Sequence, residues 1–321
     1  MTGAGMNRLL LPAALGALVL AVPLLIGQAF YINVASQILI AAIFALSLNI
    51  LVGYAGLTSL GHAAYLGTAA YMVAWLNTQG GFGHLSAAII ALVGTTAMAA
   101  LFGLMALRAT GIAFLMITLA LGQTLWGVAY RWVTVTGGDN GLPGLKRPLP
   151  FGISLMEPAA FYGFTVIVFL VALGCIAVFV RSGLGTSLLG SRDQPRRMRM
   201  LGHNVWLVQW LAFVFAGFWA AVAGIVFVYY HQYISPHALG LPASAETLLM
   251  VIAGGAGTLF GPIVGAFIVV VLKMVVSAYV TRWVMLLGIV FVVIVIFMPE
   301  GVVPGLDRLR RRLLPGRGGA P

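Results

Sequence analysis

The sequence has few charged residues and a single cysteine. Only 7% of its 321 residues are charged, whereas 62% are hydrophobic, and this balance excludes a soluble domain of that length. Cys175 lies inside an apolar run, so no intrachain disulfide can form and the redox compartment stays undetermined. Apolar runs recur along nearly the whole chain, and about 20 apolar residues in a helix cross a bilayer core. We therefore expect an all-α integral membrane protein, with residues 1–321 forming one polytopic transmembrane domain.

Motifs for nucleotide hydrolysis and catalysis are also missing. No P-loop of the form G-x-x-x-x-G-K-S/T occurs, so the chain cannot hydrolyse ATP by that route. The sequence has no G-x-S-x-G elbow, and His203, His231 and His237 show no metal-binding spacing with carboxylates. We expect a chain that is not an enzyme and binds no metal. An intramembrane hydrolase, with Ser59 as nucleophile and His62 as base, is the alternative.

The apolar runs predict ten membrane crossings. They lie near residues 9–27, 34–52, 58–76, 86–107, 110–132, 159–180 and 206–230, in a broken pair at 244–256 and 261–279, and at 283–298. The start of the chain also fits a signal peptide, but we expect it to be retained as the first helix.

The basic residues predict an orientation, because Lys and Arg accumulate on short cytoplasmic segments. With both termini in the cytoplasm, twelve of the 17 basic residues lie there, namely Arg8, Arg108, Arg181, Arg192, Arg196, Arg197, Arg199, Arg308, Arg310, Arg311, Arg312 and Arg317. The last five make 299–321 a basic cytoplasmic tail. The net charge of +11 is therefore a topology signal, and no nucleic-acid partner is expected.

The longest external segment is 133–158, where a series of glycines and prolines forbids a regular helix, namely Gly137, Gly138, Gly141, Pro143, Gly144, Pro148 and Pro150. We expect an ordered or mobile loop, which either contacts an external partner or simply connects two spans.

The longest basic stretch between spans, GSRDQPRRMRMLGHN (190–204), is here called the arginine strip. Pro195 suits a first helical turn, Asp193 or Gln194 is a suitable cap, and Gly202 suits the exit. These residues predict a two-turn helix over 195–201. At helical spacing Arg196 and Arg199 share one face, and Met198 and Leu201 share another. Such an element fits either a protein groove or a lipid headgroup layer.

The strip and the span after it, SRDQPRRMRMLGHNVWLVQWLAFVFAGFWAAVAGIVF, resemble the LivM-type permease subunits of branched-chain amino-acid ABC importers. In that family the pattern R-x-N-E-x-R-A-x-x-x-G marks a coupling helix. Arg192, Arg197 and Gly202 match it, whereas Gln194, Pro195 and Met198 depart from it.

Two further blocks extend the resemblance to about residues 34–298. SLNILVGYAGLTSLGHAAYLGTAAY (47–71) matches the family's early block at Asn49, Gly53, Gly56, Ser59, Gly61 and His62. ISPHALGLPASAETLLMVIAGGAGTLFGPIVGAF (234–267) resembles its late block.

The resemblance implies an ABC importer permease of the type II-like fold in a bacterial cytoplasmic membrane. It implies a second permease, two ATPase subunits that hold ATP and Mg, an external solute-binding protein, and no cofactor in this chain. The cytoplasmic coupling loop would span 181–205, with ATPase contacts from Arg192, Asp193, Arg196, Arg197, Met198, Leu201 and Gly202. The implied substrates are branched-chain amino acids, although relatives carry urea, amides or aromatic acids.

Glycines predict two breaks in the helices. In the late block, Ser244 is expected to cap a helix, Glu246 to lie in its first turn, and GGAG (254–257) to interrupt it, giving a broken helix near 244–262. Gly257, Gly261 and Gly265 then form a small-residue packing face. In the early block, Gly53 and Gly56 loosen the inner end of the second span, and Ser59 and His62 share a helix face. Candidates for the translocation path or the breaks are Asn49, Gly53, Gly56, Ser59, His62, Glu246, Gly254, Gly255 and Gly257.

Lys273 lies inside a span and is expected to anchor at the membrane interface rather than line the path. No proton relay is readable, which argues against the alternative of a self-sufficient secondary transporter.

Overall fold

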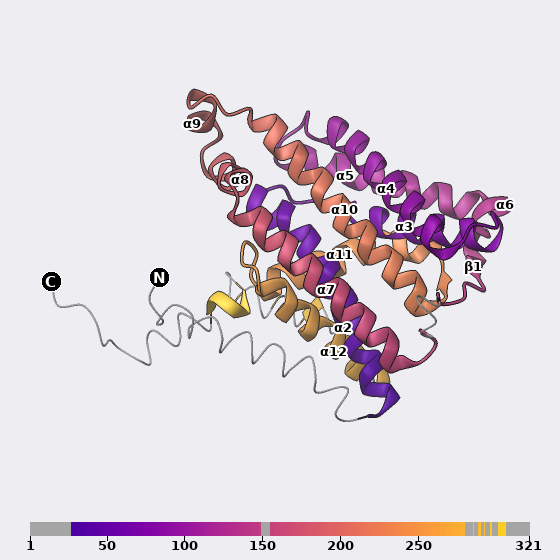
Figure 1. The fold of residues 1–321 in the computed structure, drawn as a ribbon. Helices are drawn as coiled ribbons and strands as arrows, with labels where there is room; N and C mark the ends of the chain where they lie inside the picture. Colours follow the sequence, from indigo (N-terminus) through magenta and orange to yellow (C-terminus); the bar gives the residue numbers. More distant parts are fainter. Residues whose placement is uncertain are drawn as a thin grey trace, which may run out of the picture.

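In a computed structural model the chain is a bundle of long helices (Figure 1). The structure describes residues 27–148, 155–279 and 301–305, and the single positions 285, 288, 289, 292 and 296. The principal helices are α2 (Ala29–Asn49), α3 (Ala63–Thr78), α4 (His84–Ala106), α5 (Ile112–Arg131), α7 (Pro158–Arg181), α10 (Val205–His231), α11 (Leu241–Gly254) and α12 (Gly261–Tyr279).

Each of the eight predicted spans between residues 34 and 279 overlaps one of these helices. In the described part, five helices are long and apolar enough to cross a membrane: α2 with its continuation to Ala55, α4, α5, α7 and α10. The all-α membrane fold is therefore confirmed. The predicted spans 9–27 and 283–298 lie outside the described residues, apart from single positions in the latter, so the number of ten crossings stays a prediction.

Helices α2 and α10 form the centre of the bundle. α10 packs against α3, α4 and α2, and α2 also packs against α7 and α12. Small residues allow these approaches: Ala216 and Ala220 are fully buried, and a Cβ at Gly224 would collide with the backbone of Leu66. By contrast, α4, α5 and α7 expose large apolar side chains such as Leu85, Ile112 and Val178. These exposed faces suit contact with lipid.

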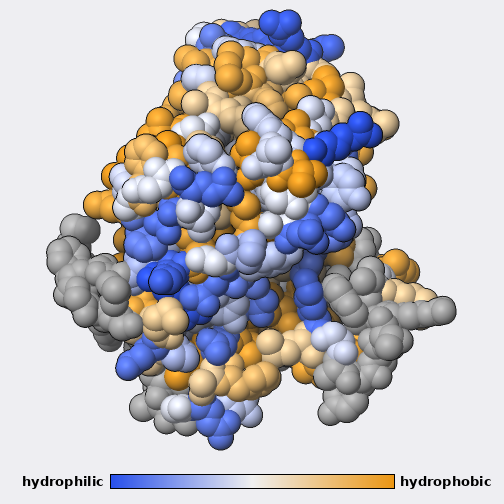
Figure 2. Space-filling model, turned by 90° about the vertical axis from the view of Figure 1, so that its right-hand side faces the viewer, coloured by the Kyte–Doolittle hydropathy of each residue, from blue (hydrophilic) through white to orange (hydrophobic). Residues whose placement is uncertain are grey.

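Short elements gather at the two ends of the bundle (Figure 1). The strip end carries α8 (Gly183–Asp193) and α9 (Pro195–Met200). The loop end carries α6 (Val133–Thr136), η2 (Gly138–Asn140) and η4 (Pro236–Leu239), with strand β1 (Leu142–Pro143) antiparallel to β2 (Tyr233–Ile234). Hydrophilic side chains cover much of this end, with apolar ones around them (Figure 2). The segment 133–158 is thus ordered where described, with single turns and one strand pair instead of a regular helix.

Arg147 holds this loop against the bundle. Its guanidinium donates to the carbonyls of Tyr229 (3.1 Å) and Tyr230 (3.0 Å) at the end of α10, and to that of Leu155 (3.2 Å). Its Cζ lies 4.5 Å from the ring centroid of Phe161. The pKa of Arg147 is lowered, because burial disfavours the charged guanidinium. The electrostatic interaction with Tyr230 raises the pKa and offsets only part of this effect. The last carbonyls of a helix lack partners within the helix, so Arg147 caps α10.

Candidate functional site: the helix breaks and the arginine strip

The early break begins where α2 changes its hydrogen-bonding pattern. Residues Ile50–Ala55 form a π-helical turn, η1, which ends at Gly56 in the left-handed conformation (φ 69°). Such π turns inside helices often occur at functional sites. The next helix, α3, begins only at Ala63. The prediction that Ser59 and His62 share a helix face is therefore wrong, because both residues precede the helix.

The late break lies between α11 and α12, as GGAG predicted. α11 ends at Gly254 and α12 begins at Gly261. Gly255 (φ 118°) and Gly257 (φ 81°) adopt backbone conformations that favour glycine. With 14 residues, α11 is about 21 Å long, which is shorter than the roughly 30 Å of a bilayer core. It is therefore a shortened helix that covers about two thirds of that thickness.

The start of α11 differs from the prediction. The helix begins at Leu241, so Ser244 and Glu246 lie beyond the positions of a cap and a first-turn acid. The Ser244 hydroxyl instead accepts a hydrogen bond from the Ala63 N–H (3.0 Å), so it caps the neighbouring helix α3. The Glu246 carboxylate pairs with Lys273 on α12, with Nζ–Oε distances of 3.1 and 3.0 Å. Sequence reasoning treated these two charges separately and missed the ion pair.

The two breaks lie directly against each other. Asn49, buried at the end of α2, donates to the Thr258 carbonyl and accepts from the Gly257 N–H, both at 2.9 Å. A Cβ at Gly53 would collide with the Gly257 amide and lie 2.7 Å from its Cα. Only glycine permits this approach of two backbones. GYAG (53–56) and GGAG (254–257), read as separate features in the sequence, thus form one junction, which we call the break junction (residues 49–56 and 254–258).

The predicted small-residue face is confirmed in part. A Cβ at Gly265 would collide with the Met250 carbonyl oxygen, and one at Gly261 with the Thr258 side chain. These glycines let α12 pack closely on α11 and the break before it. Gly257 belongs to the break junction instead, because it precedes the first residue of α12.

The arginine strip contains more helix than predicted. α9 spans Pro195–Met200, in agreement with the predicted helix at 195–201, and Gly202 (φ 85°) follows in the left-handed conformation. Asp193 lies in α8, and Gln194 precedes α9 without a side-chain capping bond. The helix α8 was not predicted. Its sequence signal is Ser182, whose hydroxyl accepts from the Gly185 N–H at 3.4 Å and caps the helix.

The two faces of α9 are also arranged differently from the prediction. Met198 lies against Gly190 of α8, with its sulfur 2.7 Å from the Cβ position of that glycine. It therefore holds the two short helices together and does not share an open face with Leu201. The exposed apolar residues are Met200 (87% exposed) and Leu201 (69% exposed). They lie beside the exposed arginines Arg196, Arg197 and Arg199.

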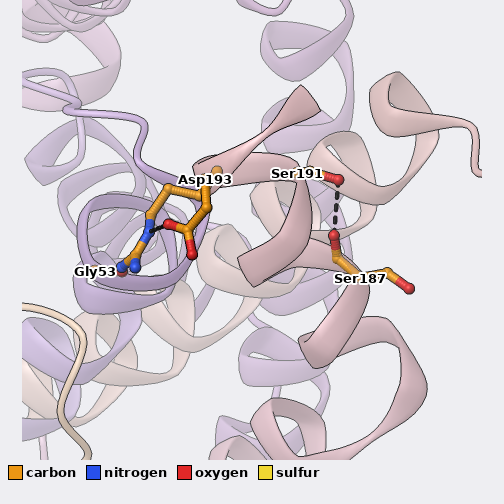
Figure 3. A network of polar contacts seen from close by, with 5 residues as sticks. Gly53, Ser187, Ser191 and Asp193 are labelled. Carbon is orange, nitrogen blue, oxygen red and sulfur yellow. Dashed lines mark hydrogen bonds and ion pairs between the residues drawn. The ribbon is translucent and has the colours of Figure 1, made fainter. Parts of the chain in front are cut away.

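Arg192 connects the strip to the break junction. Its Nη1 donates to the Gly53 carbonyl, and its Nε donates to the Asp193 carboxylate at 2.9 Å. Figure 3 shows Gly53 and Asp193 beside each other where α8 meets η1, with Ser187 and Ser191 on α8. The predicted strip residue and the predicted break residue are thus brought together.

His62 pairs with a serine other than the predicted one. Its Nε2 lies 2.8 Å from the Ser47 hydroxyl, and its ring stacks on Phe44 with the centroids 5.4 Å apart. Ser47 and His62 are completely buried, and Ser59 is 1% exposed. A substrate cannot reach these hydroxyls, so the geometry does not support the hydrolase alternative. The described residues contain no group of three or more His, Cys, Asp or Glu side chains that could hold a metal.

Comparisons with known proteins identify the family of this chain. Residues 30–297 match the model of the family described as branched-chain amino acid transport system / permease component. The chain is 26% identical to the high-affinity branched-chain amino acid transport system permease protein LivM of Escherichia coli K12, with 94% of this chain and 76% of the relative covered. It is 26% identical to LivM of Salmonella typhimurium (89% and 72% covered) and 25% identical to LivH of that organism (57% and 62% covered). No solved structure matches.

The chain therefore belongs to the family of branched-chain amino acid transport permease components. It is a multi-pass membrane protein and a permease subunit of an ABC importer, as the sequence resemblance predicted.

Proposed function

We propose that this permease forms half of a translocation path for branched-chain amino acids. The second half would be a permease of the LivH type, and an external binding protein would select and deliver the solute. The names of the relatives support this substrate class, because both LivM and LivH proteins are described as branched-chain amino acid permeases. In the bacterial inner membrane, both termini and the strip end would face the cytoplasm, and the loop end would face the binding protein.

Energy would come from two cytoplasmic ATPase subunits, which carry the ATP and Mg that this chain has no P-loop to bind. The observation that carries this proposal is the exposed surface of α9 at the strip end. Arg196, Arg197 and Arg199 provide charge, and Met200 and Leu201 provide open apolar area next to it. Exposed apolar residues rimmed by charge favour a protein partner. Closure of the ATPases would pull on α8 and α9 and open the path inward.

The test is to purify the tagged chain from its host in mild detergent, identify the proteins that accompany it, and reconstitute the complex in liposomes. We expect two P-loop ATPases, a second permease, and uptake of leucine, isoleucine and valine that requires ATP and the binding protein. Leu201→Glu should abolish uptake while the chain stays folded in the membrane. Uptake by the chain alone after ATP depletion would contradict the proposal, and selective uptake of urea or aromatic acids would contradict the substrate.

A further inference from the structure

One end of η1 depends on a side chain from the arginine strip. Carbonyl groups in the last turn of a helix have no partner within it, and Gly53 lies in that turn of η1. Arg192, in the last turn of α8, donates to the Gly53 carbonyl across 139 residues of sequence. A side chain of the arginine strip thus provides a hydrogen-bond donor to the early helix break.

The position of Arg192 is fixed from two sides. A Cβ at Gly56 would lie 2.6 Å from Arg192 Cγ, so the absence of a side chain at Gly56 makes room for the arginine stem. On the other side, Asp193 accepts from Nε. The planar guanidinium therefore bonds Gly53 with one nitrogen and Asp193 with another, a geometry that lysine cannot reproduce. The Asp193 side chain is 64% exposed, whereas that of Arg192 is 38% exposed.

The early break is packed tightly against the late break. The Gly53 and Gly257 backbones are too close for even a methyl group between them, and Asn49 bonds both Gly257 and Thr258. A displacement of Gly53 toward Gly257 would therefore push the segment between α11 and α12, and the hydrogen bonds of Asn49 resist separation of the two breaks. Closely packed elements of this kind have discrete arrangements and transmit displacement between sites.

We infer that Arg192 is a positioning residue that transmits movement of α8 and α9 to the break junction, and that it is not an ATPase contact like its neighbours on α9. This inference rests on the proposed function and specifies how the coupling helix acts on the path. Arg196, Arg197 and Arg199 would contact the ATPase, and Arg192 would transmit the resulting movement through Gly53 to the break junction.

The experiment compares Arg192→Gln with wild type in the complete complex reconstituted in liposomes. We expect uptake to fall by about tenfold or more, a size typical of coupling between sites, while the ATPases still co-purify and ATP hydrolysis stays close to that of wild type. Arg192→Lys, which keeps a donor for Gly53, should retain more uptake than Arg192→Gln. Arg108→Gln removes the same charge from the connection between α4 and α5 and should transport normally.

Normal uptake by Arg192→Gln would overturn the inference. So would loss of the ATPases from the purified variant, because Arg192 would then be a docking contact. If Arg192→Gln accumulates poorly in the membrane, the Arg192→Lys variant decides. A partial and selective loss of uptake supports the inference, whereas uptake that stays normal, or that falls together with ATP hydrolysis, overturns it. Failure of the wild-type complex to transport with ATP would instead contradict the proposed function itself.

Discussion

At the residue scale, Asn49 shows how one side chain replaces missing helix hydrogen bonds. The amide of Asn49 provides one donor and one acceptor to the break between α11 and α12, where Gly257 and Thr258 lie outside regular helix. Unsatisfied backbone groups are expensive when no water reaches them. An asparagine suits this position because its amide serves as donor and acceptor at once.

We predict that Asn49→Ala destabilises the protein, because it leaves the Gly257 N–H and the Thr258 carbonyl without partners. A fully buried group left unsatisfied costs about 1–3 kcal/mol. Because Gly257 and Thr258 are only partly buried, the free energy of unfolding should fall by about 2–4 kcal/mol, which is less than the full cost of two buried groups. The measurement is the thermal unfolding midpoint of the detergent-purified chain, which should be lower for Asn49→Ala than for wild type. Asn33→Ala on the same helix is the control, since Asn33 bonds Tyr230 through its backbone carbonyl. Equal midpoints for the two variants would contradict this account.

At the scale of elements, the end of α10 is stabilised by a side chain that lies 82 residues earlier in the sequence. The carbonyls of Tyr229 and Tyr230 carry the negative end of the helix dipole, and the positive guanidinium of Arg147 approaches both. The same group also bonds the Leu155 carbonyl just before α7. One arginine therefore joins the loop to the ends of two helices.

We predict that Arg147→Ala loosens the loop end without unfolding the bundle. Hydrogen bonds to a charged group contribute about 1.5–3 kcal/mol each when they are buried, and less for a partly exposed group such as this one. Amide hydrogen exchange should speed up by about tenfold or more in the last turn of α10, with little change in α2. Lys146→Ala removes the neighbouring exposed charge and should leave the exchange rates unchanged. Equal protection of α10 in both variants would show that Arg147 is not its cap.

At the scale of the whole molecule, hydrophobic runs sufficed to locate the eight principal helices, because helix length in a membrane is set by the bilayer. Glycine patterns also located both breaks. They did not reveal that Gly53 meets Gly257, because close backbone approach depends on how helices pack and glycine has no side chain to indicate a partner. Helix packing also determines the role of Ser244. The sequence predicted that Ser244 caps its own helix, whereas it caps α3. The Glu246–Lys273 pair was missed because its members are 27 residues apart on different helices.

We predict that the strip end and the loop end lie on opposite sides of the membrane. The chain has one cysteine, so Cys175→Ala gives a background for single-cysteine labelling. Asn140→Cys at the loop end should react with a membrane-impermeant maleimide in spheroplasts, whereas Arg108→Cys should react only after permeabilisation. Both positions are exposed. Labelling of Arg108→Cys in intact spheroplasts would reverse the proposed orientation.

The contact between Gly53 and Gly257 also limits how this protein can vary. The atoms that a new side chain at Gly53 would meet belong mainly to the backbone of Gly257, which no substitution can shorten. In a saturation library, even alanine should be rejected at Gly53, and second-site changes at its neighbours should not rescue it. The distance between the two breaks should therefore stay constant as the sequence changes, whereas the surfaces that contact other subunits can vary.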